Sequence, residues 1–367
     1  MPADDQPIRR VRSDGNVDVL GVWRAGSNML ELDRVGFPLR GPGSHHVEGD
    51  LPWVFHELAP DGFLASRFAQ WFAKLGLPTD RRLWRSDQVV SAVSECGHDL
   101  PGNLLIGDGT FERYRRIFAP GMRPGPVRGD RQLYSKFVDD ILRDAEQSSV
   151  GGARPKFALR LADQSGVIVK FTPPLDTPTG QRWADLLRME AHAAATLREA
   201  GIAAVHATYV ELGERGFLEI DRFDRLAGGG RVGHVTLHGL GAALYAEVAS
   251  APRVVESLVR DGHLGVEDAR VFARIHAFSR SIANTDTHQG NYGLIFDDDG
   301  RARLAPAYDV VPMAFAPRHD ELPDLLIPHA PAADASTRAL VLRLIARVEA
   351  DADISAEFRR AWLTAVG

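Results

Sequence analysis

The chain has 367 residues, of which 44% are hydrophobic and 25% are charged, as in an ordinary globular protein with a sizeable core. Its formal net charge of -6 argues against a general nucleic-acid-coating role. The single cysteine, Cys96, excludes an intrachain disulfide and a cysteine-based zinc cluster. The polar opening stretch and the lack of an apolar run of about 20 residues predict a cytoplasmic protein with no membrane segment.

The first clear element is a helix predicted within residues 51–76. Its apolar residues recur at helical spacing, and Gly76 with Pro78 is expected to end it. This stripe is expected to pack a small N-terminal subdomain, and it consists of Leu64, Phe68, Trp71, Phe72 and Leu75.

The chain divides at residues 119–129, where proline and glycine are too dense for a helix or a sheet to continue. After this point the predicted strands are 157–161, 167–171, 209–212 and 217–220, and the predicted helical regions are 186–200, 237–283 and 340–348. Strands early and helices late indicate an α+β, two-lobed arrangement. The predicted units are an unassigned segment at 1–50, a subdomain at 51–128, a first lobe at 129–225 and a mainly helical second lobe at 226–367.

The most informative sequence is NTDTHQGN, which places Asp286 five positions before Asn291. A protein-kinase catalytic loop has the same interval between the Asp that orients the acceptor hydroxyl and the Asn that holds magnesium. The same residue types also build plain turns, so that alternative stays open. Downstream, Asp309 in APAYDVV is a candidate second metal ligand, because magnesium prefers oxygen ligands. The alternative for Asp309 is an aspartate that closes a strand.

Two residues upstream fit a nucleotide site. Lys170 ends the run VIVK and resembles the strand lysine that pairs with nucleotide phosphates in kinases, unless it simply reaches solvent. Glu190 lies three, four or seven positions from apolar residues of its predicted helix. A charged group on an apolar face requires a partner, and Lys170 is the expected one.

A glycine-containing segment, SSVGGARPK at residues 148–156, precedes that strand. Its adjacent glycines let backbone N–H groups approach a phosphate, and Lys156 adds positive charge. The segment matches neither the usual kinase glycine motif nor a P-loop, and by itself it favours a tight turn. The order of the signals is more telling: glycine loop, strand lysine, helix glutamate, Asp–x4–Asn and late Asp follow one another as a kinase fold requires.

Together these segments resemble the HipA family of kinases. SSVGGARPKFAL is similar to the glycine-and-lysine segment of the family, and NTDTHQGN with AYDVV resembles its catalytic and metal segments. DRFDR, residues 221–225, looks like the stretch that joins the lobes and contacts adenine. FHELAPDGFLASRF resembles the N-terminal subdomain, so the resemblance runs from about residue 51 into the terminal helices, whereas residues 1–50 match no part of it.

The resemblance implies a kinase-like fold with a nucleotide-binding first lobe and a catalytic second lobe. It implies transfer of phosphate from ATP, with Mg2+, to a serine of a cellular protein such as a translation component, and a DNA-binding antitoxin of the HipB type as partner. By position, Asp286 is the catalytic acid–base residue, Asn291 and Asp309 bind magnesium, and Ser149 is autophosphorylated. The residues assigned to the nucleotide site are Val150, Gly151, Gly152, Lys156, Lys170, Glu190, Asp221, Phe223 and His288.

Three features depart from a conventional kinase. His288 stands where many kinases carry lysine, Gly290 replaces a larger residue of some relatives, and Asp309 lacks a following Phe-Gly. Because these departures leave the acceptor open, two alternatives stand. One is a small-molecule phosphotransferase on the same fold, and the other is a non-catalytic nucleotide-binding co-repressor. In either case nucleic acid is expected to be bound only through a DNA-binding partner.

Overall fold

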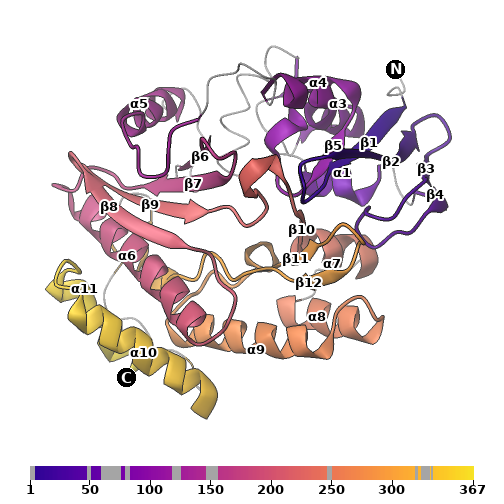
Figure 1. The fold of residues 1–367 in the computed structure, drawn as a ribbon. Helices are drawn as coiled ribbons and strands as arrows, with labels where there is room; N and C mark the ends of the chain where they lie inside the picture. The colour runs from indigo at the N-terminus through magenta and orange to yellow at the C-terminus, as the bar shows by residue number, and fades with distance from the viewer. Residues whose placement is uncertain are drawn as a thin grey trace.

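The computed structural model describes residues 5–47, 51–58, 76–78, 83–117, 125–145, 156–245, 250–318, 321–323, 331 and 334–367. Within these residues the chain forms three antiparallel sheets surrounded by helices (Figure 1). The α+β class predicted from the sequence is therefore confirmed.

The N-terminal part is built on a five-stranded sheet with the order β4-β3-β2-β1-β5. Strand β1 pairs with both β2 and β5, so residues near the start of the chain share a sheet with a segment that follows helix α3. The bounds are β1 Gln6–Val11, β2 Val17–Arg24, β3 Met29–Leu32, β4 Gly43–His46, α1 Trp53–Leu58, α3 Ser86–Cys96, η2 Gly97–Asp99, β5 Leu104–Ile106 and α4 Asp108–Ile117.

One apolar core joins this sheet to helices α1 and α3, and Ile8, Phe55 and Val93 are among its buried members. The predicted domain boundaries stay predictions, although residues on both sides of position 50 share this core. Helix α1 covers the start of the helix predicted within residues 51–76. The apolar stripe from Leu64 to Leu75 lies outside the described residues.

The middle part of the chain forms a four-stranded sheet, β6-β7-β9-β8, with α5 on one face and α6 on the other (Figure 1). Alternate side chains of a strand point to opposite faces, and Val169 and Phe171 of β7 pack against α5. The predicted strands agree with the observed ones to within a few residues. The bounds are α5 Tyr134–Ala145, β6 Lys156–Arg160, β7 Gly166–Phe171, α6 Pro178–Glu199, β8 Ala207–Leu212 and β9 Arg215–Asp221.

Helix α6 begins eight residues before the position predicted from apolar periodicity. The Oγ1 atom of Thr177 accepts a hydrogen bond from the Gly180 N–H at 3.0 Å, and Pro178 occupies the first helical position. Both features are common helix-start signals. They define the true start, whereas the apolar pattern marks only the part of α6 that packs in the core.

The C-terminal part is mainly helical, as predicted, and its core includes Phe278, Leu344 and Trp362. A three-stranded sheet, β10-β11-β12, was not predicted, because strands of three or four residues carry too little periodicity. None of the helices in the described part of the chain has both the length and the apolarity needed to cross a membrane. The bounds are η3 Ala227–Gly229, β10 Gly233–Thr236, α7 Leu237–Tyr245, α8 Ala251–Arg260, α9 Val266–Ser281, η4 Gln289–Asn291, β11 Gly293–Phe296, β12 Ala302–Leu304, η5 Met313–Phe315, α10 Ala335–Ala350 and α11 Ala356–Val366.

Candidate active site

A buried ion pair connects the central sheet to helix α6. The Nζ atom of Lys170 donates hydrogen bonds to Glu190 at 2.6 Å from Oε1 and 2.9 Å from Oε2. The two side chains are 9% and 1% exposed. The contact predicted between these residues is thus present, and each charge has the partner that burial demands.

Local geometry explains this pairing. Val169 and Phe171 face α5, so the pleat turns Lys170, which lies between them, toward α6. On α6, Glu190 precedes the buried Ala193 and Ala194 by three and four residues, which places it on the same helix face. The strand and the helix therefore present opposite charges at one point.

Helix α6 is also held by its contact with the C-terminal helices. The backbone N–H and the hydroxyl of Ser355 donate to the carboxylate of Asp185 at 2.8 and 2.6 Å. Burial raises the pKa of Asp185, and the hydrogen bonds from Ser355 oppose that rise. Asp185 precedes Glu190 by five residues on α6, so this contact helps to position Glu190. Asp185 was not predicted as a site residue from the sequence.

Asp309 joins the same cluster, because its carboxylate also accepts a hydrogen bond from Lys170 Nζ. Burial would raise the pKa of Asp309, but the charges of Lys170 and Lys156 outweigh burial and hold that pKa well below its usual range. Lys156 is the cross-strand partner of Lys170. Asp309 has a φ of 54°, which is uncommon for a residue with a side chain. An ionised carboxylate in a constrained backbone is suited to binding a metal ion.

The segment Asn284–Asn291 forms a loop after α9 that is held by its own side chains. Asn284 accepts a hydrogen bond from the Asp286 N–H at 3.0 Å, and the Asn291 amide group donates to the Asp286 carbonyl at 2.6 Å. Since the Asn291 nitrogen is used in this way, its side-chain oxygen is the atom left for a metal ion. Asn284, which the sequence analysis did not single out, is buried and fixes the backbone of Asp286.

A tyrosine links the two predicted metal ligands. The hydroxyl of Tyr308 donates to the Gly290 carbonyl at 3.1 Å. Tyr308 is adjacent in sequence to Asp309, and Gly290 is adjacent to Asn291. The hydrogen bond therefore brings the segments that carry Asn291 and Asp309 side by side.

His288 lies beside the predicted catalytic aspartate. Its Nδ1 atom accepts a hydrogen bond from the Gly290 N–H at 2.9 Å, and its Nε2 atom lies 3.4 Å from Asp286 Oδ1. Because Nδ1 is the acceptor, the ring proton belongs on Nε2, facing the carboxylate. His288 was assigned to nucleotide binding from the resemblance, and that role stays a prediction.

Three aromatic rings meet at the segment that joins the lobes. Phe223 stacks on Tyr308 with ring centroids 5.9 Å apart, and His234 meets Phe223 edge-on at 5.1 Å. Burial lowers the pKa of His234 to about 4, so this ring is neutral at pH 7. Of these three residues, only Phe223 was predicted from the sequence to belong to the site. For Tyr308, the local signal was its position directly before the candidate metal ligand Asp309.

Asp221 contacts residues that were not assigned to the nucleotide site. Its carboxylate pairs with Arg128 at 2.5 Å, and its backbone N–H donates to the His206 carbonyl at 2.8 Å. Its predicted role beside adenine stays a prediction. The glycine segment with Ser149, Val150, Gly151 and Gly152 lies outside the described residues, and only its end, Lys156, is described as the first residue of β6.

Comparison with known proteins gives matches along most of the chain. Residues 148–361 match the HipA-like C-terminal domain, and residues 3–115 match the middle domain of YjjJ-like toxins. The second match includes most of the segment to which the sequence analysis assigned nothing. Toxin YjjJ of Escherichia coli (strain K12) is 32% identical over 323 residues, which cover 85% of this chain and 70% of that protein.

Two solved structures are also similar. The first is HipA of Shewanella oneidensis MR-1, in a complex of that toxin–antitoxin system with HipB and operator DNA. It has a TM-score of 0.54 at 15% identity and covers 92% of this chain and 89% of its own, so the fold is shared. The second, the proinflammatory kinase CtkA of Helicobacter pylori, is more distant, with a TM-score of 0.41 at 12% identity over 60% of this chain and 88% of its own.

Proposed function

Since this chain belongs to the HipA family of toxins, we propose that it is an ATP-dependent serine/threonine-protein kinase that phosphorylates a serine of a cellular protein. The contact of Lys170 with both Glu190 and Asp309 is the observation that carries this proposal. In protein kinases a strand lysine, a helix glutamate and a metal-binding aspartate must come together before phosphate is transferred.

Lys170 and Lys156 are the side chains that bind the phosphates of ATP. Both start from the same end of the sheet, as cross-strand partners, and their charges reach Asp309. The Asn291 amide oxygen and the Asp309 carboxylate are the hard oxygen donors that suit magnesium. When bound there, magnesium would neutralise part of the phosphate charge. With Asp309 as a ligand of that ion, Glu190 would remain the partner that holds Lys170 in place.

Asp286 orients the acceptor. Two hydrogen bonds from side chains hold its backbone, and its own side chain is 47% exposed, so an acceptor serine can reach it. The serine oxygen forms a bond to the γ-phosphorus as the bond to the ADP oxygen breaks, and Asp286 accepts the hydroxyl proton. Such transfer depends chiefly on positioning and electrostatic stabilisation.

A DNA-binding antitoxin of the HipB type is the proposed partner. The structure of HipA from Shewanella oneidensis contains HipB and operator DNA. This chain carries a net charge of -6, which favours contact with DNA through a partner rather than directly.

Ser149 is the proposed site of autophosphorylation, by its position in the segment that resembles the HipA glycine loop. A phosphoserine carries about -1.5 to -2 charges. It would compete with the γ-phosphate for Lys156 and for the backbone N–H groups of the glycines. The modification would therefore switch the kinase off.

The proposal is tested by incubating the purified chain with γ-labelled ATP, Mg2+ and a cell lysate. Label is expected on protein serines with the wild type and not with Asp286→Asn. Asp299→Asn, which removes an exposed carboxylate, is the matched control and should label as the wild type does. If label is found only on small molecules, the phosphate acceptor is a metabolite and not a protein. ATP binding without any transfer would instead favour the nucleotide-binding co-repressor.

A further inference from the structure

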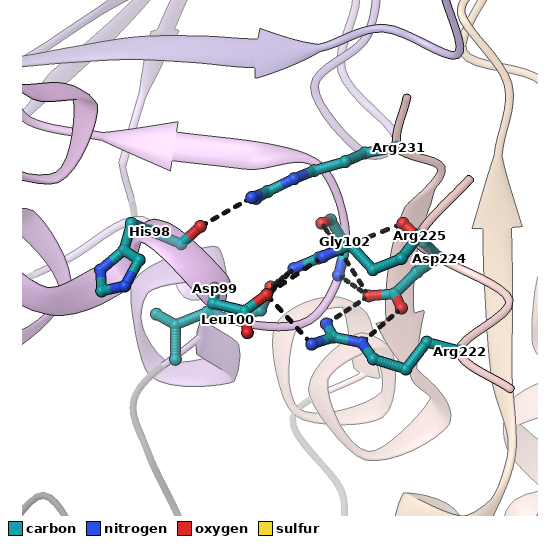
Figure 2. A network of polar contacts seen from close by, with 8 residues as sticks. All are labelled: His98, Asp99, Leu100, Gly102, Arg222, Asp224, Arg225 and Arg231. Carbon is teal, nitrogen blue, oxygen red and sulfur yellow. Dashed lines mark hydrogen bonds and ion pairs between the residues drawn. The ribbon is translucent and has the colours of Figure 1, made fainter. Parts of the chain in front are cut away.

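A second ionic cluster lies between the N-terminal part and the segment that joins the lobes (Figure 2). The N-terminal part contributes Asp99 of η2. Residues 222–231 contribute the buried Asp224, Arg225 and Arg231, and also Arg222, whose side chain is 8% exposed. Asp99 is the exception, with a side chain that is 51% exposed. The cluster consists of Asp99, Arg222, Asp224, Arg225 and Arg231.

Asp99 bridges two arginines. Its Oδ1 atom accepts hydrogen bonds from Arg222 Nη1 at 3.0 Å and from Arg225 Nη2 at 3.1 Å. Asp224 binds the same two arginines, with both carboxylate oxygens 3.0 Å from Arg222 and one 2.9 Å from Arg225. Charge-assisted and bidentate bonds of this kind fix orientation as well as adding energy.

Backbone contacts tie the same two segments together. The Gly102 N–H donates to Asp224 Oδ2 at 2.8 Å, and Arg225 donates to the carbonyls of Leu100 and Gly102 at 2.6 and 2.7 Å. A Cβ added at Gly102 would lie only 3.0 Å from the backbone nitrogen of His234. The loop of residues 99–102 therefore packs closely between the joining segment and strand β10.

The charges in this cluster do not balance, because three guanidinium groups face two carboxylates. Arg231 is 2% exposed, and its Nε and Nη1 atoms find no hydrogen-bond partner among the described residues. Burial and the nearby Arg225 lower the pKa of Arg231 to about 9. Removal of the Asp99 charge would leave three arginines against the single carboxylate of Asp224. The cluster is thus sensitive to Asp99 in particular.

Phe223 lies in sequence between two residues of this ionic cluster. Arg222 and Asp224, its neighbours in sequence, are held by the cluster, while its own ring stacks on Tyr308 and meets His234. We propose that Asp99 is a positioning residue for the nucleotide site: through Arg222 and Arg225 it holds Phe223 in place and so sets the affinity for the adenine of ATP. This inference rests on the proposed nucleotide site, and it makes the N-terminal part a component of that site.

The test compares the binding of ATP and of inorganic tripolyphosphate, both with Mg2+, to the full chain. Asp99→Asn is expected to weaken ATP binding roughly tenfold, as a lost charge-assisted contact would, and to leave tripolyphosphate binding unchanged. In the transfer assay the KM for ATP should rise with little change in kcat. Lys170→Ala, in contrast, should weaken the binding of both ligands.

Asp108→Asn is the matched control, since it removes an exposed carboxylate that pairs with Arg9 in the same part of the chain. It should bind both ligands as the wild type does. If Asp99→Asn does not fold, Asp99→Glu keeps the charge with a displaced carboxylate and should give a smaller shift in the same direction. Wild-type ATP affinity in the folded variant, or equal losses for ATP and tripolyphosphate, would overturn the inference. A wild type that binds ATP without transferring phosphate would count against the kinase proposal alone.

Discussion

The Nζ atom of Lys170 lies 2.6 Å from Oε1 of Glu190, which follows it by 20 residues on a different element. The same ammonium group also contacts Asp309 from a third segment, 139 residues away. One buried cation therefore connects the sheet, helix α6 and the predicted metal-binding loop. Lys170 thus contacts the carboxylates of both Glu190 and Asp309.

Substitution of Glu190 is expected to impair both folding and nucleotide use. Glu190→Ala removes a carboxylate that Lys170 contacts, and breaking a buried ion pair costs about 3–5 kcal/mol when nothing replaces the lost partner. The contact with Asp309 should reduce that cost. The KM for ATP should rise and kcat should fall, as measured by ATP titration and by denaturant unfolding. Glu199→Ala, at an exposed position of the same helix, is the control, and equal effects of the two substitutions would contradict the assigned role.

The two predicted catalytic carboxylates should differ in their effects on binding. Asp286→Asn and Asp309→Asn should each lower turnover by about 10² to 10⁴-fold, which is typical of general acid–base and electrostatic groups. Asp309→Asn should also weaken Mg-ATP binding, because it removes a metal ligand, whereas Asp286→Asn should bind ATP nearly normally. Isothermal titration of both variants checks the difference. Wild-type phosphorylation by both would show that the site is misassigned.

Phosphate is expected on Ser149 when the chain is expressed with an intact site. Peptide mass analysis should find it in the wild type and not in Asp286→Asn. Ser149→Asp should lose ATP binding, because its charge opposes the γ-phosphate, and Ser149→Ala should keep binding without self-inhibition. Ser148→Ala separates the two adjacent serines. Stoichiometric phosphate on Ser149 with undiminished ATP affinity would rule out the inhibitory role.

The free energy of unfolding should fall in mild acid because of His234. Its pKa is about 4 in the folded chain, below the ordinary value of 6.5, because burial and the charges of Arg222 and Arg225 outweigh the attraction of Asp224. Between those values the unfolded chain binds a proton that the folded chain does not, so stability present above pH 6.5 is lost as the pH falls toward 4.

The expected loss from pH 7 to pH 5 is about 1–2 kcal/mol, measured by urea unfolding at each pH. His234→Gln should remove that part of the dependence, whereas His238→Gln, at an exposed histidine, should retain it. An unchanged pH dependence in His234→Gln would mean that this ring does not remain neutral in the folded chain.

Those parts of the candidate site that depend on local physics could be predicted from the amino-acid sequence. The interval between Asp286 and Asn291 could be read directly, because both side chains belong to one short loop. The pairing of Lys170 with Glu190 followed from the rule that a charge on an apolar helix face requires a partner. The α+β class followed from the order of strand and helix patterns.

Which distant segments of the chain meet could not be predicted from the sequence, because it depends on how the folded elements pack. Arg225 and Asp99 are 126 residues apart, and neither residue shows a periodicity that points to the other. DRFDR carries four charged residues, and which of them face the loop of residues 99–102 depends on how that loop packs. The contact of Lys170 with Asp309 likewise depends on how the four-stranded sheet packs against the segment that carries Asp309. The hydrophobic pattern of a helix or strand shows which of its own faces is buried, but not which other element covers that face. Long-range ion pairs depend on that packing between elements, so they leave no pattern in the local sequence.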